Sequence, residues 1–145
     1  MKKLILCAAA GWLAFQANAG EWLTDLPKAL AQAKAEHKQV LLDFTGSDWC
    51  PPCKALSKTV LTSAEFEKYA TANLILVEVD FPNSKKQTAE LKTANKALAD
   101  KYSIEGFPTI IVLDDNGKQL LKSVGYGGET TAQFIAKLPK AKPGA

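Results

Sequence analysis

Two cysteines separated by two prolines, in the segment WCPPC at residues 49–53, constrain the fold of this chain more than any other feature. An apolar run at residues 40–44 precedes the segment and has the pattern of a buried strand. Proline is tolerated in the first turn of a helix, where a missing N–H costs little, so we expect a helix to begin at the cysteines. Cys50 would then be the N-cap of that helix, and Cys53 would lie one turn inside it.

The spacing of Cys50 and Cys53 fits a metal clamp, a structural disulfide or a redox pair. A zinc site usually needs four ligands, and the chain after residue 19 adds only one histidine, His37, to these cysteines. A structural disulfide across so short a loop would restrict the unfolded chain very little. A reversible redox pair is therefore the preferred interpretation. A metal-binding carrier or a non-catalytic interaction module is the alternative.

The N-terminus, residues 1–19, has the pattern of a secretory signal peptide. Lys2 and Lys3 precede an apolar run over residues 4–15, and Ala17 and Ala19 are small residues at the positions that signal peptidase reads. The apolar run is shorter than the roughly 20 residues that a membrane-spanning helix needs. We therefore expect cleavage after Ala19, export to the periplasm and no membrane anchor.

The segment left after cleavage, residues 20–145, has the size of one ordinary domain. It retains two of the three cysteines, and its formal net charge falls from +3 to +1 because Lys2 and Lys3 are removed. The chain has no arginine and no basic stripe, which argues against nucleic acid binding. We expect a monomer with one domain over residues 20–138 and a loose C-terminal tail over residues 139–145.

Hydrophobic periodicity and turn residues predict alternating helices and strands. Capping patterns at Thr62 with Glu65 and at Ser84 with Gln87 indicate two helix starts, and the DNG segment at residues 115–117 indicates a hairpin turn. This order describes a mixed α/β sheet with helices on both faces. The predicted elements are helices at 25–38, from 50, from 62 and from 84 (inner face Leu91, Ala94, Leu98 and Tyr102), strands at 40–44, 74–79, 109–113 and 118–124, and a closing helix around 134–138.

Three segments in this order make the chain resemble the thioredoxin superfamily: residues 40–44 (VLLDF), 49–54 (WCPPCK) and 106–109 (GFPT). Residues 43–50 together with 77–82 make it similar to the exported bacterial members rather than to the cytosolic thioredoxins. The resemblance covers nearly all of the chain after the signal peptide. It implies a thioredoxin fold, with a central mixed β-sheet flanked by helices on both faces. It also implies a thiol-disulfide oxidoreductase that acts on proteins through a CxxC pair, without a cofactor or a metal.

Four residues would carry the exchange chemistry. A cysteine at a helix start is stabilised as a thiolate by unpaired N–H groups and the helix dipole, so we expect Cys50 to be the exposed nucleophile and the more buried Cys53 to resolve the mixed disulfide. Asp43 matches the family's buried aspartate, which helps to move the proton of the second cysteine. Glu78 occupies a strand position where a lysine is common, and two neighbouring carboxylates would raise one pKa. A solvent-facing Glu78 is the alternative.

Three further residues would bind the substrate chain. Pro108 matches the family's cis-proline, which lies against the cysteine pair and leaves the backbone of the preceding residue free to pair with substrate. Trp49 and Phe107 would supply an apolar rim around the site. A simple strand-start proline at residue 108 and ordinary packing of the two aromatic rings are the alternatives.

The spacer between the cysteines predicts the direction of electron flow. With Cys50 as N-cap, the backbone nitrogens of Pro52 and Cys53 face its sulfur, but proline has no N–H to donate. Fewer donors stabilise the thiolate less, which makes the disulfide harder to reduce. We therefore expect a reductase that exchanges with protein thiols and disulfides and is recharged by a membrane-embedded electron donor.

Overall fold

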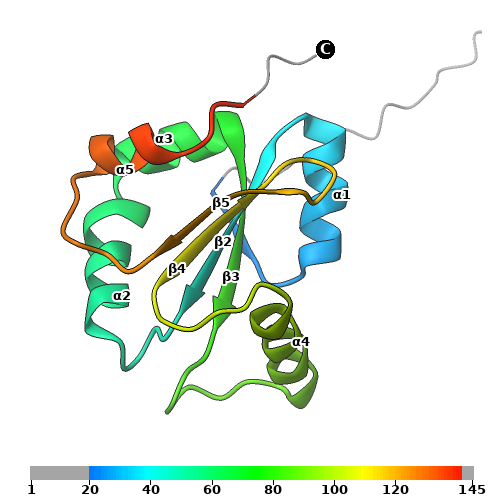
Figure 1. Cartoon of the computed structure of the whole chain (residues 1–145), viewed down its shortest axis with the longest axis vertical. Helices are drawn as coiled ribbons and strands as arrows, with labels where there is room; N and C mark the ends of the chain where they lie inside the picture. The colour runs from blue at the N-terminus through cyan, green and yellow to red at the C-terminus, as the bar shows by residue number, and fades with distance from the viewer. Residues whose placement is uncertain (1–19, 142–145) are drawn as a thin grey trace, which may run out of the picture.

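The computed structural model describes residues 20–141 as a five-stranded mixed sheet covered by helices (Figure 1). The predicted signal peptide lies outside the described residues, as do the last four residues of the predicted tail. The strands are β1 (Trp22–Leu23), β2 (Gln39–Thr45), β3 (Leu74–Asp80), β4 (Thr109–Leu113) and β5 (Gln119–Val124). The helices are α1 (Leu26–Glu36), α2 (Pro51–Leu56), the π-helical turn η1 (Ser57–Leu61), α3 (Ala64–Asn73), α4 (Ala89–Lys101) and α5 (Thr131–Lys137).

The strands lie in the order β1-β3-β2-β4-β5, with β2 at the centre between β3 and β4. β1 and β2 run parallel to β3, whereas β4 is antiparallel to both β2 and β5. The prediction of a mixed sheet is therefore confirmed. β1 was not predicted, because two residues are too few to show a periodicity.

Helices cover both faces of the sheet, as predicted (Figure 1). α1 and the end of α4 pack against one face, while α2, η1, α3 and α5 pack against the other. Side chains alternate between the faces of a strand. Asp43 on β2 and Glu78 and Asp80 on β3 consequently lie on the same face as α2, beyond the apolar core formed there by residues such as Leu41 and Leu76.

The helix predicted to begin at Ser84 is α4, which begins at Ala89. The N–H of Ser84 donates to Oδ2 of Asp48 at 2.6 Å, and the side-chain amide of Gln87 donates to the carbonyl of Asp80 at 3.1 Å. The residues read as a helix start are instead held by groups next to the cysteines and at the end of β3. The loop between β3 and α4 is therefore part of the site region.

Two smaller corrections concern helix ends and faces. The N-cap of α3 is Ser63 rather than Thr62, because the Ser63 hydroxyl accepts the N–H of the third helical residue. On α4, Ala94 was predicted to face inward but is exposed, and Asn95 is buried instead. The Asn95 side-chain N–H donates to the carbonyl of Asp80 at 2.9 Å, whereas its buried Oδ1 makes no hydrogen bond within residues 20–141.

Candidate active site

Cys50 and Cys53 form a disulfide at the start of α2, with their Cα atoms 5.2 Å apart. Cys50 is the N-cap residue, as predicted, and its sulfur accepts a hydrogen bond from the backbone N–H of Cys53 at 3.4 Å. Pro51 and Pro52 occupy the first two helical positions, where α-helices lack acceptors for N–H groups. The prolines thus begin the helix and fix the distance between the two cysteines.

The two cysteines do not differ in exposure in this disulfide form. Each residue is 3% exposed, so the predicted contrast between an exposed Cys50 and a more buried Cys53 is wrong for this state. The disulfide bond draws the end of the Cys50 side chain against Cys53 at the first turn of α2. Any difference in reactivity must therefore come from the hydrogen bonding and electrostatics of the thiols once the disulfide is open.

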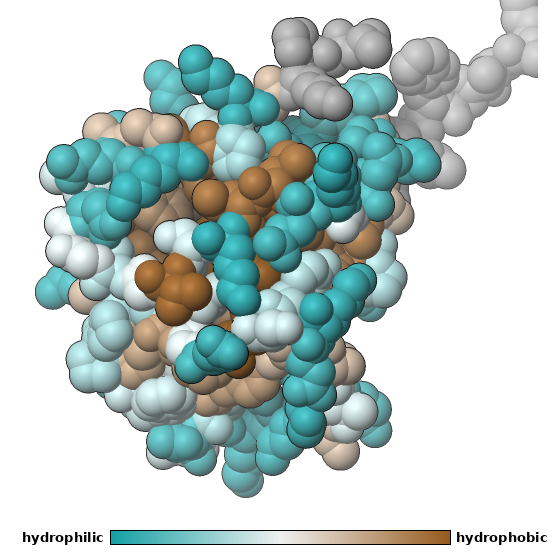
Figure 2. Space-filling model, in the orientation of Figure 1, coloured by the Kyte–Doolittle hydropathy of each residue, from teal (hydrophilic) through white to brown (hydrophobic). Residues whose placement is uncertain are grey.

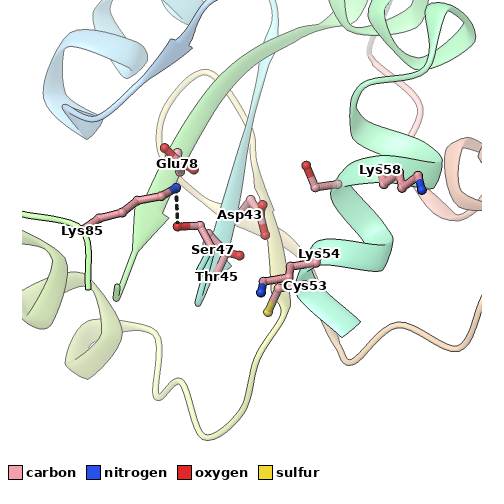
Figure 3. A pocket seen from close by; sticks show the side chains of 9 residues that line it. Asp43, Thr45, Ser47, Cys53, Lys54, Lys58, Glu78 and Lys85 are labelled. Atoms are coloured by element: carbon pink, nitrogen blue, oxygen red, sulfur yellow. Dashed lines mark hydrogen bonds between the residues drawn. The ribbon is translucent and has the colours of Figure 1, made fainter. Parts of the chain in front are cut away.

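A pocket of about 310 Å³ lies beside Cys53 (Figure 3). Asp43 and Glu78 lie directly opposite each other in the parallel register of β2 and β3, so the structure brings these two predicted residues together with Cys53. The side chain of Glu78 lines the pocket and is half-buried. The pocket is lined by Asp43, Thr45, Ser47, Cys53, Lys54, Ser57, Lys58, Glu78 and Lys85.

Asp43 is the most deeply buried acid of this pocket. It is 7% exposed, and its Oδ1 atom makes no hydrogen bond within residues 20–141. Burial, together with the negative charges of Glu78 and Asp80, raises the pKa of Asp43 to about 7. Burial and Asp80 also raise the pKa of Glu78, whereas the charge of Lys85 lowers it. An acid that titrates near neutral pH beside a thiol can accept its proton.

Aromatic side chains form a rim next to the cysteines. The indole N–H of Trp49, which is 41% exposed, donates to the carbonyl of Phe81 at 2.7 Å. The ring of Phe107 lies 5.8 Å from that of Trp49 and 5.4 Å from that of Phe81. Gly46 makes room for the indole, because a Cβ atom at residue 46 would lie only 2.4 Å from the Trp49 ring. The predicted rim residues Trp49 and Phe107 are therefore in contact.

The bond between Phe107 and Pro108 is cis, as the resemblance implied. The carbonyl of Pro108 accepts the N–H of Gly125 at 2.8 Å, while the backbone of Phe107 makes no hydrogen bond within residues 20–141. Val124, opposite Thr109 in the sheet, is 60% exposed beside this loop and was not predicted as a site residue. Figure 2 shows apolar surface gathered over its strand, β5. Val124 lies beside this loop because β5 pairs with β4, a contact that no local sequence pattern reveals.

Asp48 is a second residue that sequence reasoning missed. Its carboxylate accepts three backbone N–H bonds, from Asn83 at 2.9 Å, Ser84 at 2.6 Å and Lys85 at 3.0 Å. These bonds lower the pKa of Asp48 to about 2. Asp48 thus ties the β3–α4 loop (residues 81–88) to the segment that precedes the cysteines. No local pattern could reveal this role, because the partners lie more than 30 residues away.

Replacing Asp48 with asparagine is expected to destabilise the protein at neutral pH, since the neutral amide lacks the charge that strengthens the three bonds. The folded-state pKa of Asp48 lies below its ordinary value of 3.8, so its contribution is complete above about pH 4 and is lost as the pH falls towards 2. Urea unfolding of wild type and Asp48→Asn between pH 7 and 2 measures this. Asp100→Asn, an exposed change on α4, is the control. A difference that does not depend on pH would contradict this account.

Two other kinds of site that residues 20–141 could hold are a metal-binding cluster and a membrane-spanning helix. No three His, Cys, Asp or Glu side chains among residues 20–141 are placed to hold a metal ion. His37 ends α1, away from the cysteines in sequence and in element. No helix within these residues is long and apolar enough to cross a membrane.

A disulfide that closes so short a loop adds little to the stability of the fold, which favours a role in exchange. The chain is a thiol-disulfide oxidoreductase. By sequence it belongs to the thioredoxin-like domain family, whose model matches residues 26–142. The predicted superfamily, the thioredoxin fold and the predicted class of enzyme are thereby confirmed.

Two relatives are similar to this chain in sequence, and a solved structure is similar to it in fold. The chain is 38% identical to the disulfide bond reductase DsbH of Chlamydia pneumoniae over 79% of this chain and 68% of that protein. It is 32% identical to the thioredoxin-related protein DsbJ of the same organism over 75% of this chain, but spans only 31% of DsbJ. A solved structure of a DsbH oxidoreductase superimposes with a TM-score of 0.73 at 34% identity, covering 89% of this chain and 92% of that one.

Proposed function

We propose that this protein reduces disulfide bonds in exported proteins. The observation that carries the proposal is the sparse hydrogen bonding at the Cys50 sulfur: the N–H of Cys53 donates to it, whereas Pro51 and Pro52 have no N–H to donate. A less stabilised thiolate leaves a disulfide that is harder to reduce, so the dithiol gives up its electrons more readily. The similarity to a protein named a disulfide bond reductase supports this direction.

Reduction proceeds in two exchanges. The Cys50 thiolate attacks one sulfur of a client disulfide, which forms a mixed disulfide and releases the other client sulfur as a thiolate that takes up a proton. Cys53 then gives its proton to Asp43 and attacks the Cys50 sulfur, which breaks the mixed disulfide and releases the second client sulfur. The client gains two electrons, and the protein is left with the Cys50–Cys53 disulfide.

The client would lie across the aromatic rim. Trp49, Phe107 and Val124 offer exposed or half-exposed apolar surface, and the free N–H and carbonyl of Phe107 can pair with an extended client segment, as in strand addition. Main-chain pairing supplies affinity without selecting particular side chains, so it suits a protein that must accept disulfides in different sequence contexts.

A reductase in an oxidising compartment needs a source of electrons. The signal-peptide pattern of residues 1–19 supports export to the periplasm and removal of that segment. Each turnover leaves the protein oxidised, and the periplasm is kept oxidising. We therefore expect a membrane-embedded protein to return the Cys50–Cys53 pair to its dithiol form.

The redox potential of the Cys50–Cys53 pair tests the direction. We expect a value nearer to about −270 mV, the potential of thioredoxin, than to about −120 mV, that of a strong periplasmic oxidant. Pro51→Gly restores an N–H in the first helical turn, and Pro51→Ala, which restores the same N–H without the flexibility of glycine, is its matched control. Equilibration with dithiothreitol or glutathione buffers gives the potential of each. A wild-type value above about −180 mV would defeat the proposal and favour an oxidase or isomerase.

A further inference from the structure

The face of the sheet next to Cys53 carries three acids and no base of its own. Asp43 on β2 and Glu78 and Asp80 on β3 share this face. Like charges so close together cannot all be ionised without cost: Glu78 and Asp80 raise the proton affinity of Asp43, and Asp80 raises that of Glu78. For Asp43 to accept the proton of Cys53 near neutral pH, Asp43 rather than Glu78 must titrate there. A cation near Glu78 would lower the proton affinity of Glu78 and so favour Asp43 as the acceptor.

Lys85 supplies such a cation from the β3–α4 loop. Its Nζ donates to Oγ of Ser47 at 2.9 Å (Figure 3), and that hydroxyl donates in turn to Oδ2 of Asp80 at 2.5 Å. Figure 3 shows the Lys85 side chain extending across the pocket towards Ser47 and Glu78, on the side opposite Cys53. The backbone N–H of Ser47 also donates to Asp80, at 2.9 Å. A short chain of hydrogen bonds through Ser47 therefore links the Lys85 ammonium group to Asp80.

The backbone of Lys85 is fixed independently of its side chain. Its N–H donates to Asp48 at 3.0 Å, next to the Asn83 and Ser84 bonds to the same carboxylate. Substituting the side chain therefore leaves the loop anchored. The other cations that line the pocket, Lys54 and Lys58, come from α2 and η1, on the wall that carries Cys53.

We propose that Lys85 is a positioning residue of the redox site, which keeps Glu78 in its carboxylate form on the wall opposite Cys53 and so leaves Asp43 as the group that takes the Cys53 proton. The assignment of Asp43 rests on the proposed function. The structure shows the opposing effects on Glu78: burial and Asp80 raise its pKa, and Lys85 lowers it.

The test is a carboxyl titration of the disulfide form by NMR, in which neither cysteine titrates. Lys85→Gln is expected to shift the Glu78 midpoint upward, and Lys85→Arg is expected to restore it. Lys86→Gln is the matched control, because this neighbouring lysine lies outside the pocket lining. The shift should shrink in 1 M salt, where the Debye length falls from about 10 Å at 0.1 M to about 3 Å. A Glu78 midpoint that is equal in wild type and Lys85→Gln overturns the proposal.

The pH profile of mixed-disulfide resolution gives a second readout that a merely structural role would not move. Lys85→Gln is expected to change the pH dependence of that step, with rescue by Lys85→Arg and no change for Lys86→Gln. An unchanged profile overturns the role of Lys85 in proton transfer. Failure of the proposed function has a different signature, because a wild-type protein that reduces no disulfide can still show the Glu78 shift in its oxidised form.

Discussion

Cys53→Ser is expected to abolish turnover and to accumulate mixed disulfides with clients, whereas Cys50→Ser traps none. Cys50 is the N-cap of α2, where its sulfur accepts a helix N–H and faces the positive end of the helix dipole. Its thiolate is therefore favoured over that of Cys53, which lies one turn inside, beside Asp43. Without the Cys53 thiol the first exchange still occurs, but nothing attacks the resulting mixed disulfide.

Non-reducing gels and mass spectrometry of the two variants incubated with reduced-and-reoxidised insulin measure the trapped species. The Cys50→Ser, Cys53→Ser double variant is the control for adventitious disulfides. Alkylation of the reduced wild-type protein should label Cys50 before Cys53. Because both residues are 3% exposed in the disulfide form, that order reports on reactivity rather than on the accessibility seen there. Trapping by Cys50→Ser would reverse the assignment of nucleophile and resolving thiol.

Insulin reduction, measured beside a zinc titration of the reduced protein, separates the proposed enzyme from the two alternatives. A metal-binding carrier would bind zinc stoichiometrically through its reduced cysteines and reduce insulin slowly. An interaction module would neither bind zinc nor reduce insulin.

Asp43→Asn is expected to stabilise the protein at pH 8 while slowing resolution of the mixed disulfide. The folded-state pKa of Asp43, about 7, lies above its ordinary 3.8, so the folded state holds a proton that the unfolded chain releases. The free energy of unfolding of wild type therefore falls as the pH rises from about 4 to about 7. A difference of about 3 pKa units corresponds to about 4 kcal/mol at pH 8, taken as an order of magnitude.

Urea unfolding at pH 4 and pH 8 measures the stability effect, which should be large at pH 8 and small at pH 4. Stopped-flow measurement of the two exchanges should show slower resolution and nearly unchanged formation of the mixed disulfide. Glu78→Gln is the comparison, and its smaller effect on stability follows from its half-buried position. Equal resolution rates in wild type and Asp43→Asn would leave Asp43 with a structural role alone.

The sequence predicts the central elements of the fold because their signals are local. Residues 40–44 and 74–79 are apolar runs that became β2 and β3, and the DNG segment became a turn in which Gly117 has a φ of 84°. The predicted start of α4 at Ser84 is wrong. Serine is common at N-caps, but here the Ser84 N–H donates to Asp48 and the helix begins at Ala89. A contact between segments far apart in the chain overrode a local preference.

The same division applies to the candidate site. Cys50, Cys53 and Asp43 could be predicted, because the motif spacing and an acid within an apolar strand are visible in the sequence. The nearness of Glu78 depended on the register of β2 against β3, which the sequence alone does not set. Lys85 could not be found, because its role depends on how the loop after β3 folds back onto Ser47.

Gly46, beneath the ring of Trp49, shapes the apolar rim next to the cysteines. Because no side chain fits at Gly46, the indole of Trp49 settles against the backbone there and reaches Phe81 and Phe107. The surface that we propose binds a client is thus shaped by the glycine beneath it. A larger residue at position 46 would have to displace the indole, and the Gly46 carbonyl also accepts the N–H of Cys50 at 2.9 Å. The shape of the apolar rim and the placement of the first cysteine are therefore coupled through one backbone position.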